Sequence, residues 1–471
     1  MRTHPLEGPR TLGYRPDGSF LVEDGQLNGV AAGLVRGWPT TMGQMSRSTP
    51  LWRQAESVLS GNWIGGHTVP ARTLYPHQWS WDTAFIAIGL AHVAPHRAWQ
   101  DLHSLFLAQW PDGRVPHIVF DPAVSDRDYF PGPSFWRQAG HPLSRASTTG
   151  IVQPPVHALA VWLLHQTHPA PDELRRLYPL LVRQQHYLAA NRDAGGAGLV
   201  SIVHPWESGL DNSPAWDDAL SVLPDDTHVL KQHHRRDVEV SVVSHRPTDR
   251  DYARYIALAM TYRDQGYQDF GVPGPHPFLV ECPAFNALTA AAELALADIA
   301  AALGADPLPH RERAAAIGQA MVERLYQPET GMFHALDVRT GKPSPARCIS
   351  GLIPIILPDL PEAIADSLAT QALSAHFGMA ALPLPSYDRL AVDFDPVRYW
   401  RGPVWINMNW LLWRGFTTHG RTDIADTLRA SMLELIERSG CFEYFHPVTG
   451  EGIGTAEFSW TAALALDLLK E

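Results

Sequence analysis

Apolar residues recur with helical spacing along most of the chain. Between residues 285 and 304, for example, Leu288, Ala292 and Leu296 fall four positions apart, and Gly304 stands where such a helix would end. Together, the segments with this period predict about a dozen helices. The other segments are 83–93, 96–110, 155–168, 172–191, 251–267, 312–326, 360–373, 403–416, 422–440 and 455–470.

Four long segments without this period separate the helices. They cover residues 61–82, 110–155, 195–250 and 377–402, and they hold most of the Trp, Pro, Gly and His side chains. Loops of this length inside a folded domain are usually functional or disordered, and their aromatic content disfavours disorder. Strand-like alternation is short and local, as in residues 331–343, which predict a β-hairpin.

This pattern predicts an all-α fold, a barrel of helical hairpins whose long loops gather around one end. Neither a Gly/Ser-rich linker nor a clear repeat divides the helical segments. We therefore expect an irregular arm over residues 1–45 and one barrel domain over residues 46–471. Residues 195–250 are expected to form a cap or loop insertion on that barrel.

Composition and charge narrow the functional classes. A chain of 471 residues that is 45% hydrophobic and contains 16 Trp can bury a large core. Its formal net charge of −12 argues against nucleic acid and against an anionic membrane surface as partners. No apolar run approaches the roughly 18 residues of a membrane span, and the first ten residues lack the apolar core of a signal peptide.

The cysteines also indicate an intracellular protein. Cys282, Cys348 and Cys441 are scattered and form no C-x-x-C motif, which disfavours a disulfide framework or a zinc cage. A reducing compartment fits this usage best. We therefore expect a soluble, cytoplasmic protein.

The common cofactor and nucleophile motifs are absent from the sequence. It contains no glycine-rich dinucleotide motif after a strand, no phosphate-binding loop, no G-x-S-x-G elbow and no H-E-x-x-H. His92 and His96 have metal-like spacing, but Pro95 stands between them and interrupts a shared helical face. We expect neither a cofactor nor a metal, so the chemistry falls to carboxylates, aromatic rings or histidines.

The segment HPWESGLDNSPAWDD, residues 204–218, crowds carboxylates and indoles into a poor helix and a poor strand. A Trp ring can cover the apolar face of a sugar, while a carboxylate can bind its hydroxyls or transfer a proton. A solvated acidic loop with buried Trp residues is the competing interpretation. The acids concerned are Glu207, Asp211, Asp217 and Asp218, and the indoles are Trp206 and Trp216.

A second aromatic segment is YPHQWSWDTAFIAIGLAH, residues 75–92. Asp82 follows Trp79 and Trp81 and opens an apolar helix. An Asp at this position can simply satisfy free N–H groups at the helix start. A cap needs no flanking indoles, however, so a site role is favoured.

The third segment, residues 441–464, places Glu443 among Phe442, Tyr444 and Phe445. A carboxylate beside aromatic rings loses hydration, which raises its pKa and suits proton transfer. Glu451 and Glu457 compete for this role, and Glu457 also suits the first turn of a helix. Upstream, RYWRGPVWINMNW supplies a candidate pocket lining of Tyr399, Trp400, Arg401, Trp405 and Asn409, although packing alone would also explain Trp405 and Trp410.

The motifs ESGLDNSPAWD, YWRGPVWINMNW, WSWDTAF and FEYFHPVTGE…FSWTAAL resemble the signatures of glycoside hydrolase family 63. Within the family they resemble the bacterial branch of glucosylglycerate and mannosylglycerate hydrolases. The resemblance runs from about residue 50 to the C-terminus. It implies an (α/α)6 barrel with minor β-hairpins and an inverting α-glycosidase that works without a metal.

The resemblance also implies individual roles. By motif position, Asp211 is the general acid, Glu443 the general base and Asp82 a sugar-binding acid near the cleavage point. Arg246 and Tyr252 are implied to hold glycerate, with Arg250 and Arg254 standing nearby. The implied sugar-ring subsite comprises Tyr75, Trp81, Gln153, Trp206, Tyr399, Trp400 and Trp405.

Inverting hydrolysis sets requirements for the two catalytic acids. They stand roughly 6.5–9.5 Å apart, which leaves room for the attacking water. Asp211 must keep its proton near neutral pH, and desolvation by Trp206 and Trp216 together with neighbouring acids would favour this. A hexosyl glycerate is a small anion, so a local arginine, Arg246, has to bind it despite the net negative charge of the protein.

Three alternatives remain open at this point. The first is an inverting α-glucosidase for neutral oligosaccharides. The second is a sugar epimerase or isomerase on a similar barrel, for which His77, His117 and His204 are candidate bases. The third is a non-catalytic sugar-binding protein. The choice between glucose and mannose and the oligomeric state, including a homo-oligomer, are not determined by the sequence.

Overall fold

Every segment with helical spacing contains a helix in the structure, a computed structural model that describes residues 49–126, 128–137, 147–232, 235, 237–269, 276–378 and 382–470. These residues belong to one unit, Met45–Glu471. One further helix, α1 (Pro50–Gly61), precedes the first predicted one. The arm expected over residues 1–45 lies outside the described residues and stays a prediction.

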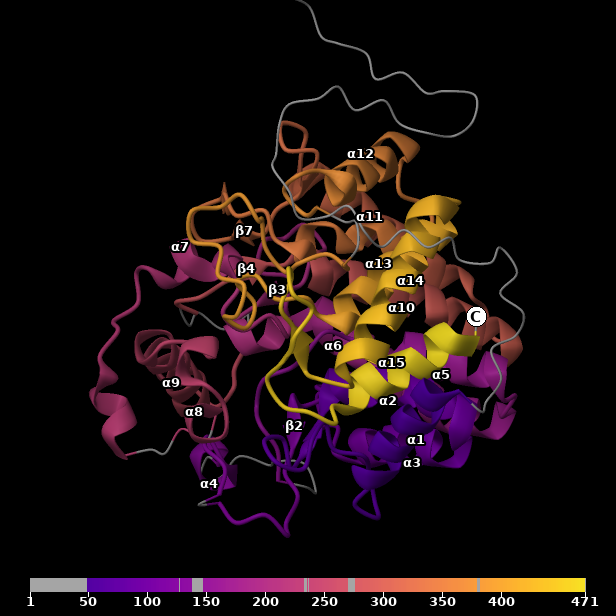
Figure 1. Ribbon diagram of the computed structural model, residues 1–471, viewed down its shortest axis with the longest axis horizontal. Coiled ribbons are helices and arrows are strands. Elements are labelled where there is room, and N and C mark those ends of the chain that lie inside the picture. Colours follow the sequence, from indigo (N-terminus) through magenta and orange to yellow (C-terminus); the bar gives the residue numbers. More distant parts are fainter. Residues whose placement is uncertain are drawn as a thin grey trace, which may run out of the picture. The chain divides into compact units, whose positions relative to one another are not determined.

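Six elements form the inner ring of the barrel, and each contacts the next. The last of them, at the C-terminus, returns to lie beside the first, which closes the ring (Figure 1). Their residues are buried on nearly every side, which is why these segments are apolar throughout. In chain order the six are α2 (Ser80–Val93), α5 (His157–Thr167), α10 (Pro283–Ala302), the 3-10 pair η5 (Ile349–Gly351) and η6 (Ile353–Ile356), α13 (Ile406–Thr418) and α15 (Ser459–Lys470).

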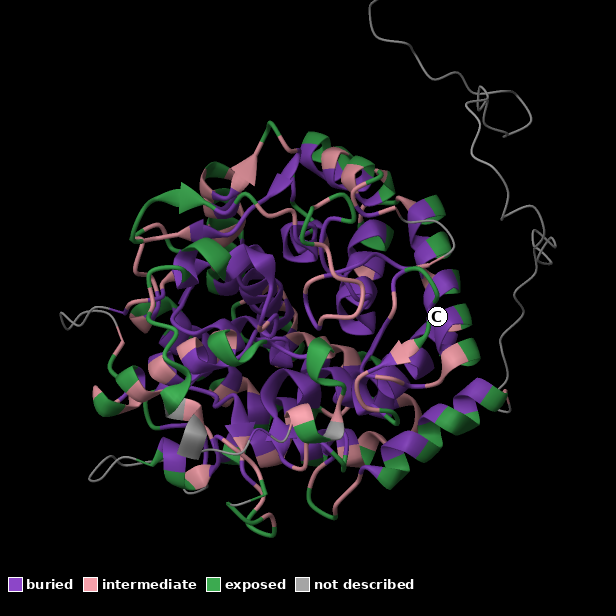
Figure 2. Ribbon diagram, turned by 60° about the vertical axis from the view of Figure 1, so that its left-hand side comes forward, coloured by how far each residue is buried: buried purple, intermediate pink, exposed green. Residues whose placement is uncertain are grey.

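An outer layer of amphipathic helices covers the inner ring. In α6, for example, Leu174, Leu177, Leu181 and Leu188 are buried at intervals of three, four and seven residues, while the opposite face is polar. Figure 2 shows the exposed faces of the outer helices around the buried inner ribbons. The layer consists of α1, α3 (Pro95–Leu107), α6 (Pro171–Asn191), α11 (Leu308–Arg324), α12 (Glu362–Leu373) and α14 (Thr422–Ser439). The predicted (α/α)6 barrel is therefore confirmed.

Short antiparallel strands connect the loops. The hairpin predicted within 331–343 is present as β7 (Leu336–Asp337) paired with β8 (Lys342–Pro343). These strands extend a four-stranded sheet through β4 (Val280–Glu281) to β3 (Ser201–Ile202). The remaining pairs are β1 (Gln78–Trp79) with β2 (Ile118–Val119), β5 (Tyr326–Gln327) with β6 (Met332–Phe333), and β9 (Tyr444–Phe445) with β10 (Gly452–Ile453).

The segment 195–250 is less irregular than its composition predicts. Prolines at first helical positions and local side-chain caps start a series of short turns, for example where the Ser213 hydroxyl accepts a bond from the N–H of Ala215. A longer helix, α9 (Asp249–Asp264), follows. The short elements are η1 (Pro205–Ser208), η2 (Pro214–Trp216), α7 (Asp217–Leu220), η3 (Thr227–Gln232), α8 (Asp237–Val240) and η4 (Val243–His245), and α4 (Pro133–Trp136) lies in the loop before α5.

The structure explains two features of the sequence by their burial in the core: the apolar helix α10 and the three cysteines. Helix α10 is the one described helix that is long and apolar enough to cross a membrane, and most of it is buried inside the protein. Its burial against α5, α6 and α11 accounts for its apolar composition. Cys282, Cys348 and Cys441 are all free and buried.

Gly89 allows α2 and α15 to pack closely. A Cβ at this position would lie 2.2 Å from the carbonyl oxygen of Ala463, whereas a Cβ at Gly318 in α11 would meet Leu357 at an ordinary 3.9 Å. We expect Gly89→Ala to lower the free energy of unfolding by about 1–3 kcal/mol, and Gly318→Ala to raise it by up to about 1 kcal/mol. Urea unfolding followed by circular dichroism measures both changes. Equal effects of the two substitutions would contradict the close helix contact.

Candidate active site

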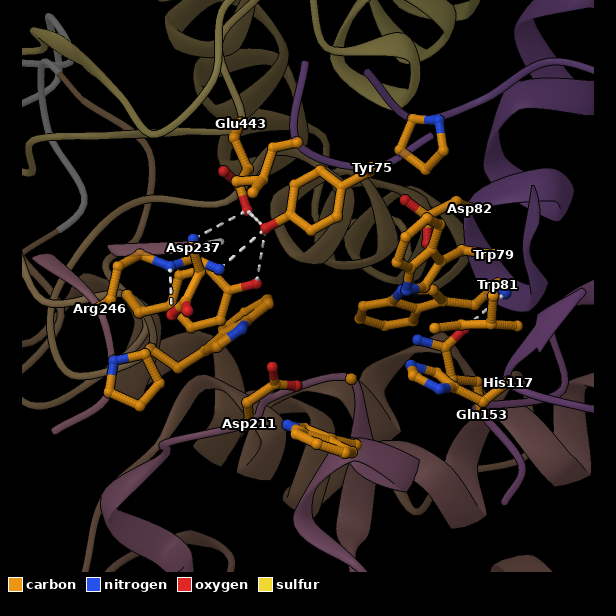
Figure 3. Close-up of a pocket in the computed structure, with 18 of the residues that line it drawn as sticks. Tyr75, Trp79, Trp81, Asp82, His117, Gln153, Asp211, Asp237, Arg246 and Glu443 are labelled. Carbon is orange, nitrogen blue, oxygen red and sulfur yellow. Dashed lines mark hydrogen bonds and ion pairs between the residues drawn. The ribbon is translucent and has the colours of Figure 1, made fainter. Parts of the chain in front are cut away.

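One cavity at the N-terminal ends of the inner helices collects every residue to which the family resemblance gave a role (Figure 3). Trp81 and Asp82 lie in the first turn of α2, Gln153 shortly precedes α5, and Trp405 immediately precedes α13. The individual roles of these residues stay predictions. The indicated residues that line the cavity are Tyr75, Trp81, Asp82, Gln153, Trp206, Asp211, Arg246, Tyr252, Tyr399, Trp400, Trp405 and Glu443.

Asp211 and Glu443 point into this cavity from opposite sides (Figure 3). Asp211 lies between η1 and η2, while Glu443 immediately precedes β9, so the two come from remote parts of the chain. Each lies within range of the other's charge. A ligand in the cavity would therefore lie between two carboxyl groups.

A tight turn aims Asp211 at the cavity. Its key residue is Gly209, which has a φ of +71°, and a Cβ there would lie 2.5 Å from the Trp81 ring. Glycine is thus required both for the left-handed backbone and for the close approach to Trp81. Behind the turn, the indole of Trp216 donates a hydrogen bond to the carbonyl oxygen of Leu210 at 2.8 Å.

The pKa of Asp211 is raised to about 7, chiefly because burial disfavours its charged form. The carboxylates of Glu443 and Asp237 raise this pKa further, while Arg246 opposes the shift. The two predicted causes, desolvation and repulsion from neighbouring acids, are both present, but the acids are Glu443 and Asp237 rather than those of the segment 204–218. Of the two indoles, Trp206 lines the cavity, whereas Trp216 is completely buried and does not line it.

The remaining acids of the segment 204–218 do not line the cavity. Glu207 is completely buried and pairs with Arg192. Asp217 and Asp218 are exposed, and Asp217 pairs with Arg401 at 2.7 Å. The solvated-loop interpretation therefore holds for the end of the segment, while Asp211 belongs to the site.

Glu443 is held by two hydrogen-bond donors and one ion pair. The hydroxyl of Tyr75 donates to its Oε1 at 2.6 Å, and the backbone N–H of Thr455 donates to its Oε2 at 3.3 Å. Arg246 Nη1 lies 3.5 Å from Oε1. The side chain is only 1% exposed, whereas its competitors Glu451 and Glu457 are exposed.

Arg246 is a buried cation with unused hydrogen-bonding capacity. Its Nη2 donates to the Tyr75 hydroxyl at 3.0 Å, and its guanidinium carbon lies 4.1 Å from the centre of the Tyr399 ring. Nε lies 3.5 Å from Asp237 Oδ2. Neither Nε nor Nη1 forms a hydrogen bond with any of the described residues. A planar carboxylate is the partner that such a guanidinium binds best.

Aromatic rings form the walls of the cavity. Trp400 and Trp405 stack with centroids 3.8 Å apart, and Tyr399 meets Trp405 edge-on at 5.1 Å. Elsewhere on the wall, Trp206 and His117 stack at 6.4 Å. Flat apolar faces beside carboxylates suit a sugar ring, which has both apolar C–H faces and hydroxyl edges.

Asp82 is not a helix cap. Helix α2 begins at Ser80, and its cap residue Trp79 makes no side-chain cap bond. Burial raises the pKa of Asp82 well above its usual range, and the charges of Glu443 and Asp211 add to the shift. The helix-start interpretation and the site interpretation of Asp82 are compatible, because its carboxyl makes a backbone hydrogen bond in the first turn of α2 and also lines the cavity.

Two polar side chains are positioned by neighbouring backbone. Gln153 Oε1 accepts a hydrogen bond from the N–H of Trp81 at 3.1 Å, which links the loop before α5 to α2. The Tyr252 hydroxyl donates to the carbonyl oxygen of Phe130 at 3.2 Å. The guanidinium of Arg235 lies 4.2 Å above the ring of Tyr252. Gln153 is thus part of the site rather than an incidental loop residue.

Sequence reasoning missed several lining residues, of which Asp237 is the only charged one. Asp237 lies in a strongly charged stretch that resembles a solvated surface, so its pattern gave no signal. The aromatic ones could have been found from the density of aromatic residues in the long loops. The missed aromatic side chains are Tyr129, Phe130, Trp136, Phe458 and Trp460, while Trp79 and His117 had been named only as an indole flanking Asp82 and as an alternative base.

Two residues singled out in RYWRGPVWINMNW have structural roles instead. Asn409 exchanges hydrogen bonds with the backbone of Leu384 at 2.8 and 3.0 Å. Arg401 bridges Asp217 and Asp393 near the surface. Neither side chain lines the cavity, and Trp410 is completely buried in packing.

The histidines near the cavity are poorly suited to act as bases. Burial lowers the pKa of His117 to about 3 and that of His204 to about 4. Both ring nitrogens of His204 lie at hydrogen-bonding distance from backbone atoms, of Trp206 and of Tyr255. Among the described residues, no three His, Cys, Asp or Glu side chains are grouped closely enough to hold a metal ion.

Comparisons with known proteins identify the family of this chain. A family model described as mannosylglycerate hydrolase MGH1-like glycoside hydrolase domain matches residues 75–461. A mannosylglycerate hydrolase of Thermus thermophilus is 42% identical over 418 residues, covering 88% of this chain and 99% of that protein. A glucosylglycerate hydrolase of Mycolicibacterium hassiacum is 36% identical over 447 residues, covering 89% and 98%.

A solved structure is similar as well. The crystal structure of a GH63 mannosylglycerate hydrolase from Thermus thermophilus, in complex with Tris and D-glycerate, aligns with a TM-score of 0.82 at 41% identity. The alignment covers 88% of this chain and 99% of that one.

An (α/α)6 barrel with two carboxyls facing across an aromatic cavity defines a glycoside hydrolase of the helical-barrel type. More narrowly, the chain belongs to glycoside hydrolase family 63, in the group described by the mannosylglycerate hydrolase MGH1-like domain.

The raised pKa of Asp211 predicts a pH-dependent cost in stability. The folded protein holds this proton up to about pH 7, whereas an ordinary Asp loses it near 3.8, so stability falls as the pH rises between these values. We expect Asp211→Asn to raise the free energy of unfolding by about 2 kcal/mol at pH 8, a discounted value because water in the cavity screens the group.

At pH 5 the gain should be less than half as large, because less of the titration interval has been crossed. Urea unfolding at both pH values measures the difference, with the exposed Asp218→Asn as a control that should change little at either pH. A gain that did not increase with pH would contradict the assigned pKa shift.

Proposed function

We propose that the protein hydrolyses a hexosyl glycerate, either mannosylglycerate or glucosylglycerate, with inversion at the anomeric carbon. The observation that carries this proposal is the buried guanidinium of Arg246, which has two unused donor atoms beside a pair of facing carboxyls. The carboxyls suit glycosidic cleavage, and the guanidinium suits a leaving group that carries a carboxylate.

In the proposed reaction, Asp211 is the general acid. Its carboxyl donates a proton to the glycosidic oxygen as the bond from that oxygen to the anomeric carbon breaks, and glycerate leaves with its hydroxyl restored. A pKa of about 7 leaves roughly half of Asp211 protonated at neutral pH, so the free enzyme has a proton to give. Asp211 ends the step as a carboxylate.

Glu443 is the general base in this scheme. It takes a proton from a water molecule that attacks the anomeric carbon on the face opposite to the leaving oxygen. The donors Tyr75 and Thr455 bind the carboxylate oxygens and fix their direction. Asp82 and the stacked Trp400 and Trp405 would hold the sugar ring. The proton on Glu443 and the vacancy on Asp211 are then exchanged with solvent, which restores the starting state.

The glycerate end would lie against Arg246. Substrate and protein are both negatively charged overall, but such repulsion is screened beyond about 8–10 Å in physiological salt. Binding therefore depends on local contacts, and Nε and Nη1 of Arg246 are available for them. Tyr252 lines the same cavity and could contact the glycerate hydroxyl.

The related proteins support this substrate class. Those from Thermus thermophilus and Mycolicibacterium hassiacum are named for mannosylglycerate and glucosylglycerate respectively, and the former was crystallised with D-glycerate. The alternatives are weaker. A neutral oligosaccharide would leave the buried Arg246 donors unmatched. An epimerase would need basic histidines, and burial leaves His117 and His204 only weakly basic.

Removal of Arg246 should separate charged from neutral substrates. We expect Arg246→Ala to raise KM for the hexosyl glycerate about 10- to 100-fold, equivalent to about 1.5–3 kcal/mol for hydrogen bonds to a charged group, and to raise KM for the glycerol analogue much less. Steady-state kinetics on both substrates measures the ratio. Arg250→Ala, which changes an exposed arginine near the same segment, should leave both KM values unchanged. Equal increases for the two substrates would remove Arg246 from the glycerate role.

The anomer released first tests the proposed stereochemistry. We expect proton NMR of a fresh reaction to show the β-hexose first, because water attacks opposite to the α-linked leaving group. Running mannosylglycerate and glucosylglycerate in parallel identifies the preferred sugar. Glu443→Gln should abolish turnover of both. Appearance of the α-anomer first would require a retaining mechanism and would contradict the role of Glu443 as base.

A further inference from the structure

A chain of buried charges lies directly behind the loop that carries Asp211. Arg192 donates from Nη1 and Nη2 to the two carboxylate oxygens of Glu207, both at 2.8 Å. On its other side, Arg192 Nε lies 2.8 Å from Asp269, which also pairs with Arg114 at 3.0 Å. The four side chains are at most 5% exposed and alternate in sign.

Each carboxylate oxygen of Glu207 accepts two hydrogen bonds. Besides the two bonds from Arg192, Oε1 accepts the backbone N–H of Val152 at 3.2 Å, and Oε2 accepts the N–H of Val203 at 2.8 Å. One carboxylate thus joins three segments: the end of α6, the strand leading into the Asp211 loop, and the loop before α5. Val152 is adjacent to Gln153, which lines the cavity, and Glu207 is four residues from Asp211.

Stability alone is a poor explanation for this arrangement. Burial of charged groups carries a desolvation cost that often exceeds the attraction between them, so apolar residues of similar volume would hold a loop at least as firmly. A carboxylate with four directed bonds does something apolar contacts cannot, because it fixes both position and orientation. Glu207 and Arg192 do not line the cavity, so neither can touch a substrate held there.

We propose that Glu207 is a positioning residue, which together with Arg192 fixes the Asp211 carboxyl relative to the sugar-binding wall formed by Gln153 and Trp81. This inference rests on the proposed role of Asp211 as general acid. A proton donor must lie within hydrogen-bonding distance of the glycosidic oxygen, and a displacement of about 1 Å costs about 100-fold in rate. Loss of Glu207 should therefore harm proton donation more than it harms sugar binding.

The test compares two substrates that differ in their need for an acid. A hexosyl glycerate needs a proton on its leaving oxygen, whereas the α-hexosyl fluoride of the same sugar releases fluoride without one. We expect Glu207→Gln, which keeps the side-chain volume, to lower kcat about 100-fold on the glycerate glycoside and less than 10-fold on the fluoride. The ratio of the two losses comes from one preparation, so it does not depend on the fraction of protein that is folded.

Glu293→Gln is the matched control. Glu293 is also a buried carboxylate, which extends from the inner helix α10 to pair with His310 and Arg313 of the outer helix α11, and it does not line the cavity. This variant should lower the melting temperature without changing the ratio between the substrates. If Glu207→Gln yields no soluble protein, the same ratio measured on Arg192→Lys, which keeps the charge but loses the two-pronged donor, decides the question.

Asp211→Asn, measured in parallel, distinguishes a failure of the positioning role of Glu207 from a failure of the acid role of Asp211. A ratio of at least 10 for both Asp211→Asn and Glu207→Gln supports the inference. A large ratio for Asp211→Asn with a ratio below 10 for Glu207→Gln overturns the positioning role alone. A ratio below 10 for Asp211→Asn itself removes Asp211 as the acid and with it the basis of the inference.

Discussion

Asp211 and Glu443 lie across one cavity, where burial and mutual repulsion make it costly for both carboxyls to be charged. The surrounding donors are distributed unequally between them. Glu443 has Tyr75, the N–H of Thr455 and Arg246 Nη1 at its oxygens, whereas Asp211 is burdened by desolvation and by two negative neighbours. In the proposed mechanism, this asymmetry favours Asp211 as the proton donor and Glu443 as the base.

The fold explains how remote loops meet at one point. The inner helices are mostly apolar along their length, and the polar side chains that line the cavity lie at or near their ends. The site forms where α2, α5, α13 and α15 begin, and these N-termini carry partial positive charge that favours acidic groups. Gly209 and the Trp216 indole then turn one loop sharply enough to bring Gly209 against Trp81 and to direct Asp211 into the cavity. The barrel thus supplies both the enclosure and the anchoring for the irregular segments.

Much of this could be predicted from the sequence. The helical period indicated the barrel because inner and outer helices bury continuous or one-sided apolar surfaces, and aromatic motifs pointed to the site because exposed indoles are costly. The role of a residue could not be predicted where it depends on a contact with a residue far away in the sequence. Asp237 could not be told from a surface acid without Arg246 beside it. Glu207 and Trp216 looked like candidate site residues, but they pack behind the loop.

The charges around Arg246 explain how a protein with a net charge of −12 can hold an anion. Arg235, Asp237, Arg246 and Glu443 alternate in sign, and the contacts that Arg246 makes with Asp237 and Glu443 are 3.5 Å long, too long for strong hydrogen bonds. These contacts balance the charge of the guanidinium without occupying its donors. Stacking on Tyr399 keeps the guanidinium plane fixed, which a lysine could not achieve. A carboxylate that enters the cavity can therefore bind a cation that is already oriented. The Nε and Nη1 atoms of Arg246 remain available to donate hydrogen bonds to it.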